Sequence, residues 1–436
     1  MGQIESKFSS RRDSGCWRGM QEYSQLTSVK RERRIERICN LYPLRPVKPG
    51  LLTSLIVGFP KTDVDDPKEN CLPMNRRLTV LTLLAALVAC MTGAAIAQED
   101  TMPARPMYGH LKPNLRADLN TPATPLKTFN GQFTYKNHVY KYNMVGTAPA
   151  TGTSTTIPTF IIPVKLVYVT STGTTTFSPQ VKLSNGQTAV QNTVASPVFA
   201  SGIDFTSNGV DLGSTQYIDA FQRANFWGTV KTHTGYHLLL GAPKVLPLLT
   251  LTVPTADGRV GTEFGVKVGL ADINWFDAQL ESYITAHTQI VPNSLPIFIT
   301  YNSYLTSGGC CIGGYHNAMG SISAPQAYAH FTYLNKPGVF SQDVSALSHE
   351  VGEWADDPLV VNTSGNSVAC GILETGDPEE GFTNYGGFPY TLNGFTYNLQ
   401  DLVFLPYFGA PTTTSAGGSL SFQGNPFGLT VCSNGG

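Results

Sequence analysis

The segment DVSALSHEVGEWADDP, residues 343–358, constrains this chain more than any other stretch. At about 100° per residue, its large apolar side chains fall on one stripe of a helix. They are Val344, Leu347, Val351 and Trp354. His349 and Glu353 are four positions apart and lie together on the opposite side. We therefore expect a short helix that docks its apolar face in the core and presents an imidazole and a carboxylate on the other.

The sequence also marks the ends of this helix. Asp343 or Ser341 is placed to accept a hydrogen bond from the first backbone N–H groups of the helix. Asp356-Asp357-Pro358 then ends it, because proline has no N–H and disfavours helical backbone in the residue before it.

The HEVGE sequence at 349–353 has the spacing of a metal-binding helix. In HExxH enzymes the side chains at i and i+4 bind one ion, and the glutamate between them is the general base. By that interpretation His349 and Glu353 are ligands, and Glu350 removes a proton from water. The segment resembles the zincin motif with its second histidine replaced by glutamate.

A mononuclear catalytic site needs a third protein ligand, and LETGD at 373–377 offers one. In zincins of the glutamate type, the third ligand is a glutamate about that far downstream, and an aspartate shortly after it orients the first histidine. The resemblance therefore implies Glu374 as a ligand. It implies Asp377 as the group that orients His349, or as a substitute ligand. The competing interpretation is a solvated helix face with no ion.

His316 belongs to the Gly-rich stretch CCIGGYH between two expected strands. Two interpretations are open. In the first, His316 or its neighbour Tyr315 donates a hydrogen bond to an oxyanion near the ion and takes part in catalysis. In the second, His316 is a loop residue that adjacent disulfides keep near the helix.

Four cysteines follow residue 97, at positions Cys310, Cys311, Cys370 and Cys432. An even number in an exported chain indicates disulfides. Because a bond between adjacent cysteines is strained, we expect Cys310 and Cys311 each to reach Cys370 or Cys432. A zinc site made of all four thiolates is the alternative, although no CxxC spacing is present.

An export signal begins at Met74 rather than at residue 1. A short basic start, MNRR, is followed by an apolar run at 78–88 and by the small-residue cleavage site AIA at 95–97. We expect a signal peptide over 74–97, too short in its apolar part for a permanent membrane span, and a secreted product, extracellular or periplasmic. Residues 1–73 are then a disordered leader or lie upstream of the true start. Lipid anchoring at Cys90 is the alternative.

The charge is divided unevenly along the chain. Residues 1–97 hold 15 of the 29 basic and 9 of the 30 acidic residues, a net charge of +6. The remainder has 29 − 15 = 14 basic and 30 − 9 = 21 acidic residues, a net charge of −7. Nucleic acids bind clustered Lys and Arg, which this acidic part lacks, so we expect no nucleic-acid partner.

The pattern beyond residue 97 predicts an α+β fold. Residues 98–127 form a Pro- and Thr-rich linker or arm, and 128–294 are β-rich, with 159–169 as an edge strand because of its proline. Helices are expected at 214–227 and 272–287 and strands at 295–305 and 326–334. The C-terminal half, 295–436, would be a zincin-like strand, helix and loop region, with 128–436 as a single domain as the alternative.

The order of the motifs resembles a group of secreted bacterial proteins and, more distantly, the plant exordium (phosphate-induced) family. The similarity spans 295–408. The matching positions are Tyr315, His316, His349, Glu350, Glu353, Asp357, Pro358, Glu374, Gly376 and Asp377. The matching residues support a metal site. Exordium proteins carry the motif in the cell wall and are linked to growth signalling, and this resemblance implies no substrate.

Two function classes follow. The first is a secreted, metal-dependent hydrolase with Zn²⁺ as its cofactor, a peptidase that acts on peptides or an extracellular polymer. Two carboxylates and one imidazole also suit a harder divalent ion such as Mn²⁺ or Ca²⁺. The second is a non-catalytic extracellular binding, matrix or cell-wall protein with a structural or vestigial ion site. A disulfide-stapled β module without metal is a third possibility.

Overall fold

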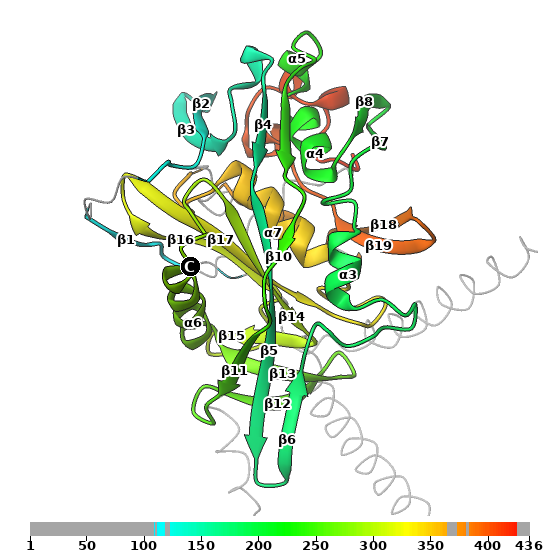
Figure 1. Cartoon of the computed structure of the whole chain (residues 1–436). Helices are drawn as coiled ribbons and strands as arrows, with labels where there is room; N and C mark the ends of the chain where they lie inside the picture. The colour runs from blue at the N-terminus through cyan, green and yellow to red at the C-terminus, as the bar shows by residue number, and fades with distance from the viewer. Residues whose placement is uncertain (1–108, 110, 118–122, 364–372, 381–382, 425–436) are drawn as a thin grey trace, which may run out of the picture. The chain divides into compact units, whose positions relative to one another are not determined.

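A mixed sheet organises the part of the chain that the structure describes (Figure 1). β5, β14 and β17 are parallel at its centre, and β16 is antiparallel to β17. β1 is added in parallel to the outer edge of β16, and β10 pairs with β5 on the side away from β14. β11 and β6 pair with the C-terminal part of β5 on opposite sides of it. The strands are β1 (Asn114–Arg116), β5 (Thr159–Thr170), β6 (Gly173–Phe177), β10 (Lys244–Val245), β11 (Leu249–Val253), β14 (Leu295–Tyr301), β16 (Gly314–Ser321) and β17 (Ala324–Tyr333).

The computed structural model describes residues 109, 111–117, 123–363, 373–380 and 383–424. The expected leader (1–73), the expected signal peptide (74–97) with its alternative anchor Cys90, and most of the expected arm lie outside these residues. All of the described residues belong to one compact unit.

Smaller sheets and short helices surround the main sheet. A three-stranded sheet contains β12 (Gly258–Glu263), β13 (Val266–Asp272) and β15 (Ser303–Thr306). The strand pairs are β2 (Thr128–Tyr135) with β3 (His138–Val145), β4 (Ser154–Ile157) with β9 (His237–Leu240), β7 (Ile203–Ser207) with β8 (Val210–Thr215), and β18 (Gly387–Leu392) with β19 (Phe395–Gln400). The α-helices are α3 (Ala189–Val194), α4 (Tyr217–Asn225), α5 (Trp227–Val230), α6 (Ile273–Ala286) and α7 (Ser345–Asp356). The 3-10 turns are η1 (Pro149–Thr151), η2 (Asp377–Glu379), η3 (Thr383–Gly386), η4 (Leu405–Phe408), η5 (Thr412–Thr414) and η6 (Ala416–Gly418).

The main sheet is apolar on both faces, with α7 packed on one face and α6 on the other. Because side chains alternate along a strand, Ile161 of β5 belongs to one core cluster and Ile162 to the other. The first cluster contains Leu347 and Trp354 of α7, and the second contains Phe276 of α6. The sheet therefore separates α6 from α7, and residues of β16 alternate between the two helices.

The sequence patterns predicted several of these elements. α4 and α6 confirm the expected helices at 214–227 and 272–287, and the Asp272 side chain caps α6 by accepting from Asn274 N and Trp275 N. In the expected β-rich region, aromatic and polar residues alternate over 129–145, and the structure forms the β2–β3 hairpin there, with Lys136 and Asn137 at positive φ in its turn.

The placement of 159–169 at a sheet edge was wrong, since β5 lies between β14 and the β10/β11 side of the sheet. Ile161 O accepts from Leu246 N on that side, and backbone groups alternate along a strand. The nitrogen of Pro163 therefore faces the same side, between the residues that pair with β10 and those that pair with β11. The gap between these two short strands accommodates a residue that has no N–H.

The described fold is mixed α/β and rich in strands. β5 from the expected N-terminal half pairs with β14 from the expected C-terminal half, so the two halves share one sheet. Among the described residues, no helix is both long and apolar enough to cross a membrane.

His330 of β17 makes the stability of this fold dependent on pH. Its side chain is fully buried against Phe276, Nε2 lies 3.1 Å from Thr300 Oγ1, and burial lowers its pKa to about 3. The unfolded chain protonates this histidine near pH 6.5, so the folded state loses stability as the pH falls from about 6.5 toward 3. From pH 7 to pH 5 we expect wild type to lose about 2 kcal/mol more than His330→Gln, which stays neutral.

Urea unfolding of both proteins at the two pH values measures this difference. His138→Gln, a substitution at an exposed histidine of β3, is the control for replacing a histidine by glutamine. Equal pH dependence in wild type and His330→Gln would contradict the assignment.

Candidate metal centre

The helix α7 is buried along its whole length. Leu347, Val351 and Trp354 pack in the core cluster on one face of the main sheet, as the apolar stripe predicts. The helix ends at Asp356, which confirms the predicted stop before Asp357 and Pro358. Its polar side chains are buried too, so they face protein groups instead of solvent.

The predicted cap of α7 was wrong. Val344 is the N-cap residue, and no side chain caps the helix. Asp343 has a positive φ, and its carboxylate accepts from Val344 N and from Asn398 N of β19. Asp343 thus connects the start of α7 to β19. Its carboxylate is oriented by this contact with a distant strand and not by the first turn of the helix.

His349 and Glu353 meet as the i, i+4 spacing predicts. His349 Nε2 lies 3.0 Å from Glu353 Oε2 and 3.5 Å from Asp377 Oδ1. One ligand atom from each of these three residues lies within 4.8 Å of the others. His349 and Glu353 are almost completely buried, whereas the Asp377 side chain is 17% exposed. This group combines one imidazole with two carboxylates.

The segment around Gly376 fixes both α7 residues. Gly376 N and Asp377 N lie 3.0 and 3.3 Å from Glu353 Oε1 and donate to it. Gly376 also packs on the His349 ring so closely that a Cβ there would lie 2.2 Å from Nδ1. Gln400 Nε2 in turn donates to Gly376 O at 3.0 Å. Backbone groups therefore orient one oxygen of Glu353 and leave Oε2 facing His349.

His316 lies on β16 and is buried against the same helix. Its Nε2 is 2.9 Å from Asp357 O, and because a carbonyl oxygen only accepts, this nitrogen carries the proton. In the neutral ring the lone pair is then on Nδ1, which lies 3.6 Å from Glu350 Oε2 and 3.8 Å from Glu353 Oε2. A histidine that donates one N–H to a backbone carbonyl is oriented as metal-binding histidines usually are. Donation to an oxyanion from Nδ1 would require the doubly protonated ring.

Glu350 is 1% exposed, and its two carboxylate oxygens make no hydrogen bond with any residue that the structure describes. Gly314 of β16 makes room for it, since a Cβ at that position would lie 2.5 Å from Glu350 Oε1. A buried carboxylate without donors is costly unless it is protonated or beside a cation. The site therefore contains an acceptor that the described protein groups do not satisfy.

Glu374 is 3% exposed, and its Oε2 lies 4.0 Å from His316 Nε2. The structure thus brings the proposed third ligand to the same buried cluster. Glu374 does not belong to the group of close ligand atoms that His349, Glu353 and Asp377 form. The geometry favours Asp377 over Glu374 as the companion of His349 and Glu353.

Burial and neighbouring charges set the electrostatics of this cluster. Burial raises the pKa of Glu350 and that of Glu374 well above their usual value, and the carboxylate of Glu353 raises both further. Burial alone would lower the pKa of His349, but the nearby carboxylates of Glu353 and Asp377 outweigh it and raise this pKa well above its usual value. The cluster is one in which positive charge is strongly favoured.

The donor set suits a divalent cation. A second group, made of His316, Glu350 and Glu353, also brings one ligand atom from each residue within 4.8 Å of the others. Imidazole nitrogens and carboxylate oxygens are ligands for Zn²⁺ and for harder divalent ions. A cation bound by these groups would account for the buried Glu350 oxygens, which have no hydrogen-bond donor among the described residues.

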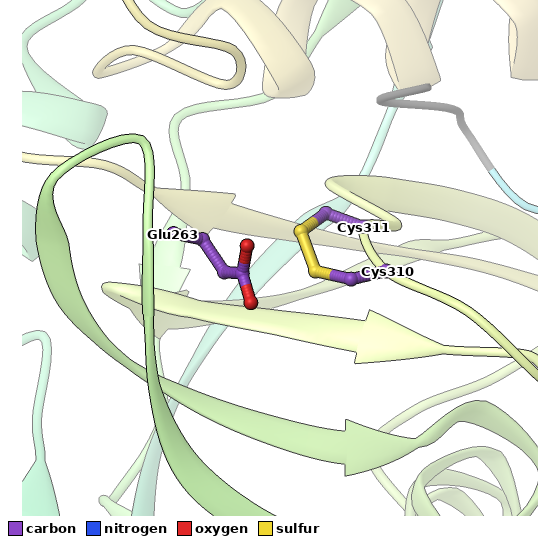
Figure 2. Close-up of side chains that lie close together, drawn as sticks. All are labelled: Glu263, Cys310 and Cys311. Atoms are coloured by element: carbon purple, nitrogen blue, oxygen red, sulfur yellow. A yellow bond between two sulfur atoms is a disulfide. The ribbon is translucent and has the colours of Figure 1, made fainter. Parts of the chain in front are cut away.

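The cysteines are arranged differently from the prediction. Cys310 and Cys311 form a disulfide with each other, so the expectation that each reaches Cys370 or Cys432 was wrong for this pair, and both partners lie outside the described residues. Leu305 and Ile312 exchange both backbone hydrogen bonds and close the loop that holds the pair. Figure 2 shows the Glu263 carboxylate directed toward this disulfide. A bonded pair offers no thiolates, so the four-thiolate zinc site is excluded in this form.

Comparisons with protein-family models, with curated proteins and with solved structures found no match to this chain.

Sequence reasoning missed the residues that position the ligands. Gly376 lies within LETGD and Gly314 within GGYH, and their position beside residues proposed for the site was the available signal for a positioning role. Gln400 carried no signal, because only the folded chain brings it to Gly376.

Gly376→Ala should disturb the centre without straining the backbone. Gly376 has φ −95° and ψ −34°, which alanine adopts, so the added Cβ acts only through its clash with His349. We expect a loss of about 1–3 kcal/mol in the free energy of unfolding. We also expect weaker cation binding, measured by titration calorimetry beside denaturant unfolding. Gly309→Ala is the matched control, because a Cβ there meets no atom within 4 Å. An unchanged Gly376→Ala protein would contradict the described packing.

Proposed function

We propose that this chain is a hydrolase dependent on a divalent cation, with Zn²⁺ the first ion to test, exported and acting on peptides or an extracellular polymer. One observation supports this most: the Glu350 carboxylate is buried beside the ligand groups with no hydrogen-bond donor among the described residues. Buried polar groups with a purely structural role are almost always hydrogen-bonded, so an unsatisfied carboxylate favours a catalytic role. A general base needs a carboxylate oxygen that can accept a proton from water.

His349 and Glu353 would hold the cation, with Asp377 as the third ligand and Glu374 beside them. When bound, the cation supplies Lewis-acid chemistry to the reacting carbonyl and to water. The zincin-like assignment of the C-terminal half rests on this set of residues and on the HExxE spacing.

The protein groups have distinct roles in this proposal. Gly376 N and Asp377 N hold Glu353 in place, and Gly376 fixes the plane of the His349 ring. Glu350 accepts the proton of the attacking water at a carboxylate oxygen and passes it to the leaving group. Burial keeps bulk water away, which strengthens each of these electrostatic interactions.

A structural ion in an extracellular binding or matrix protein is the second candidate function. The observation that favours it is burial: His349, Glu350, Glu353 and Glu374 are each at most 3% exposed. Structural ion sites are closed, whereas catalytic sites keep an open position for substrate. The two functions differ in what Glu350 does once the ion is bound.

Glu350→Gln distinguishes the two functions. The variant keeps the shape of the side chain and loses its basicity, so a hydrolase should retain bound metal and lose turnover by about 100- to 10,000-fold. Metal content by elemental analysis and hydrolysis of a fluorogenic peptide library are the two measurements. Glu281→Gln on α6 is the matched control and should leave both unchanged.

His349→Ala completes the test, because it removes a ligand and should lower the metal content. If wild type binds no divalent cation, both candidate functions fail. If it binds the cation and no substrate in the library is hydrolysed, the structural function stands and the hydrolase proposal fails.

A further inference from the structure

We infer that the centre has a second cation position, formed by His316, Glu350 and Glu353, whose occupation inhibits the hydrolase. The inhibitory part of this inference rests on the function proposed above, in which Glu350 is the acid–base group. The existence of the position does not depend on that function and rests on the geometry and charge of the residues.

Three residues from two elements converge at this position. His316 comes from β16, and Glu350 and Glu353 come from α7. His316 Nδ1 lies 3.6 Å from Glu350 Oε2 and 3.8 Å from Glu353 Oε2. Separations of this size are expected between ligand atoms that share an ion at about 2.0–2.2 Å from each. All three side chains are at most 3% exposed.

The orientation of His316 fits a ligand. Its Nε2 proton is donated to Asp357 O, so the neutral ring directs the Nδ1 lone pair at the two carboxylates. Glu350 supports the position independently of His316, because its buried oxygens have no hydrogen-bond donor among the residues described. A cation at this position would satisfy the two Glu350 oxygens.

Glu353 belongs to both cation positions. Backbone N–H groups of Gly376 and Asp377 hold its Oε1, and its Oε2 faces His349 at 3.0 Å and His316 at 3.8 Å. One carboxylate therefore lies between two groups of ligands, the arrangement by which two-metal centres hold adjacent ions.

The charge of the cluster also points to two ions. Glu350, Glu353, Glu374 and Asp377 carry −4 when all are ionised. One divalent cation leaves −2 in a buried site, and two divalent cations leave zero. Unbalanced buried charge is expensive, so the donor set is large for one ion and matched to two.

The second ion should bind more weakly than the first. The two positions share an oxygen, so a second divalent charge is repelled by the first. Once it is bound, the lone pairs of Glu350 are directed at the cation, and this carboxylate can no longer accept a proton from water. Hydrolysis should therefore rise with cation concentration as the first position fills and fall as the second one fills.

A Mn²⁺ titration of the full, metal-stripped chain tests the position without any substrate. Mn²⁺ is the probe because it favours oxygen and nitrogen ligands over thiolates, and the chain contains cysteines outside this site. We expect about two bound Mn²⁺ per chain by calorimetry in wild type, and an electron paramagnetic resonance spectrum broadened by coupling between neighbouring ions. His316→Gln should bind about one and lose the broadening, while its amide still donates toward Asp357 O. His138→Gln, an exposed histidine, is the matched control and should bind about two.

Glu350→Gln provides a second variant should His316→Gln unfold, and it too should bind about one Mn²⁺. One bound ion in wild type overturns this inference and leaves the proposed function standing. No bound ion overturns both. Two ions in wild type and in both variants place the second ion elsewhere and overturn the assignment to these residues. For inhibition, the fall in turnover at high cation concentration should disappear in His316→Gln, and a fall that persists overturns that part alone.

Discussion

The burial of charge on α7 is the constraint on which the rest of this structure depends. A helix that is apolar on one side and carries a histidine and two glutamates on the other is enclosed on both. The apolar side packs on the main sheet, and the polar side is covered by β16 and by the segment at 373–377. Leaving such a face without compensation costs several kcal/mol, which explains why backbone donors and a second imidazole converge on it.

The local features of the fold could be read from the sequence because they follow from neighbouring residues. The spacing of His349 and Glu353 and the positions of the helices α4 and α6 each depend on a short run of neighbouring side chains. The position of β5 at the centre of the sheet could not be read, since it is decided by where the short strands β10 and β11 pair. The cap of α7 failed for the same reason, because a contact with β19 controls Asp343.

The candidate site likewise contains residues that local motifs predicted and contacts that only the folded chain determines. The HExxE segment predicted three residues of the cluster, His349, Glu350 and Glu353, and the LETGD stretch predicted Glu374 and Asp377. What the sequence could not supply was which of them meet, because this depends on the placement of β16 against the helix. The Cys310–Cys311 disulfide differs from this, because its two partners are adjacent in the sequence. The prediction failed there because a bond between adjacent cysteines was judged too strained to form.

The short strand β1 has a consequence for how this protein can be handled. It pairs with the outer edge of β16, and Gly109 N donates to Gly314 O farther along the same edge. Without this cover, the edge of a large, mostly apolar sheet would present a row of open backbone groups, which is a template for pairing between chains. Gly109 and β1 therefore cover this edge, and a chain trimmed beyond them would expose the backbone of the strand that carries His316 to pairing with other chains.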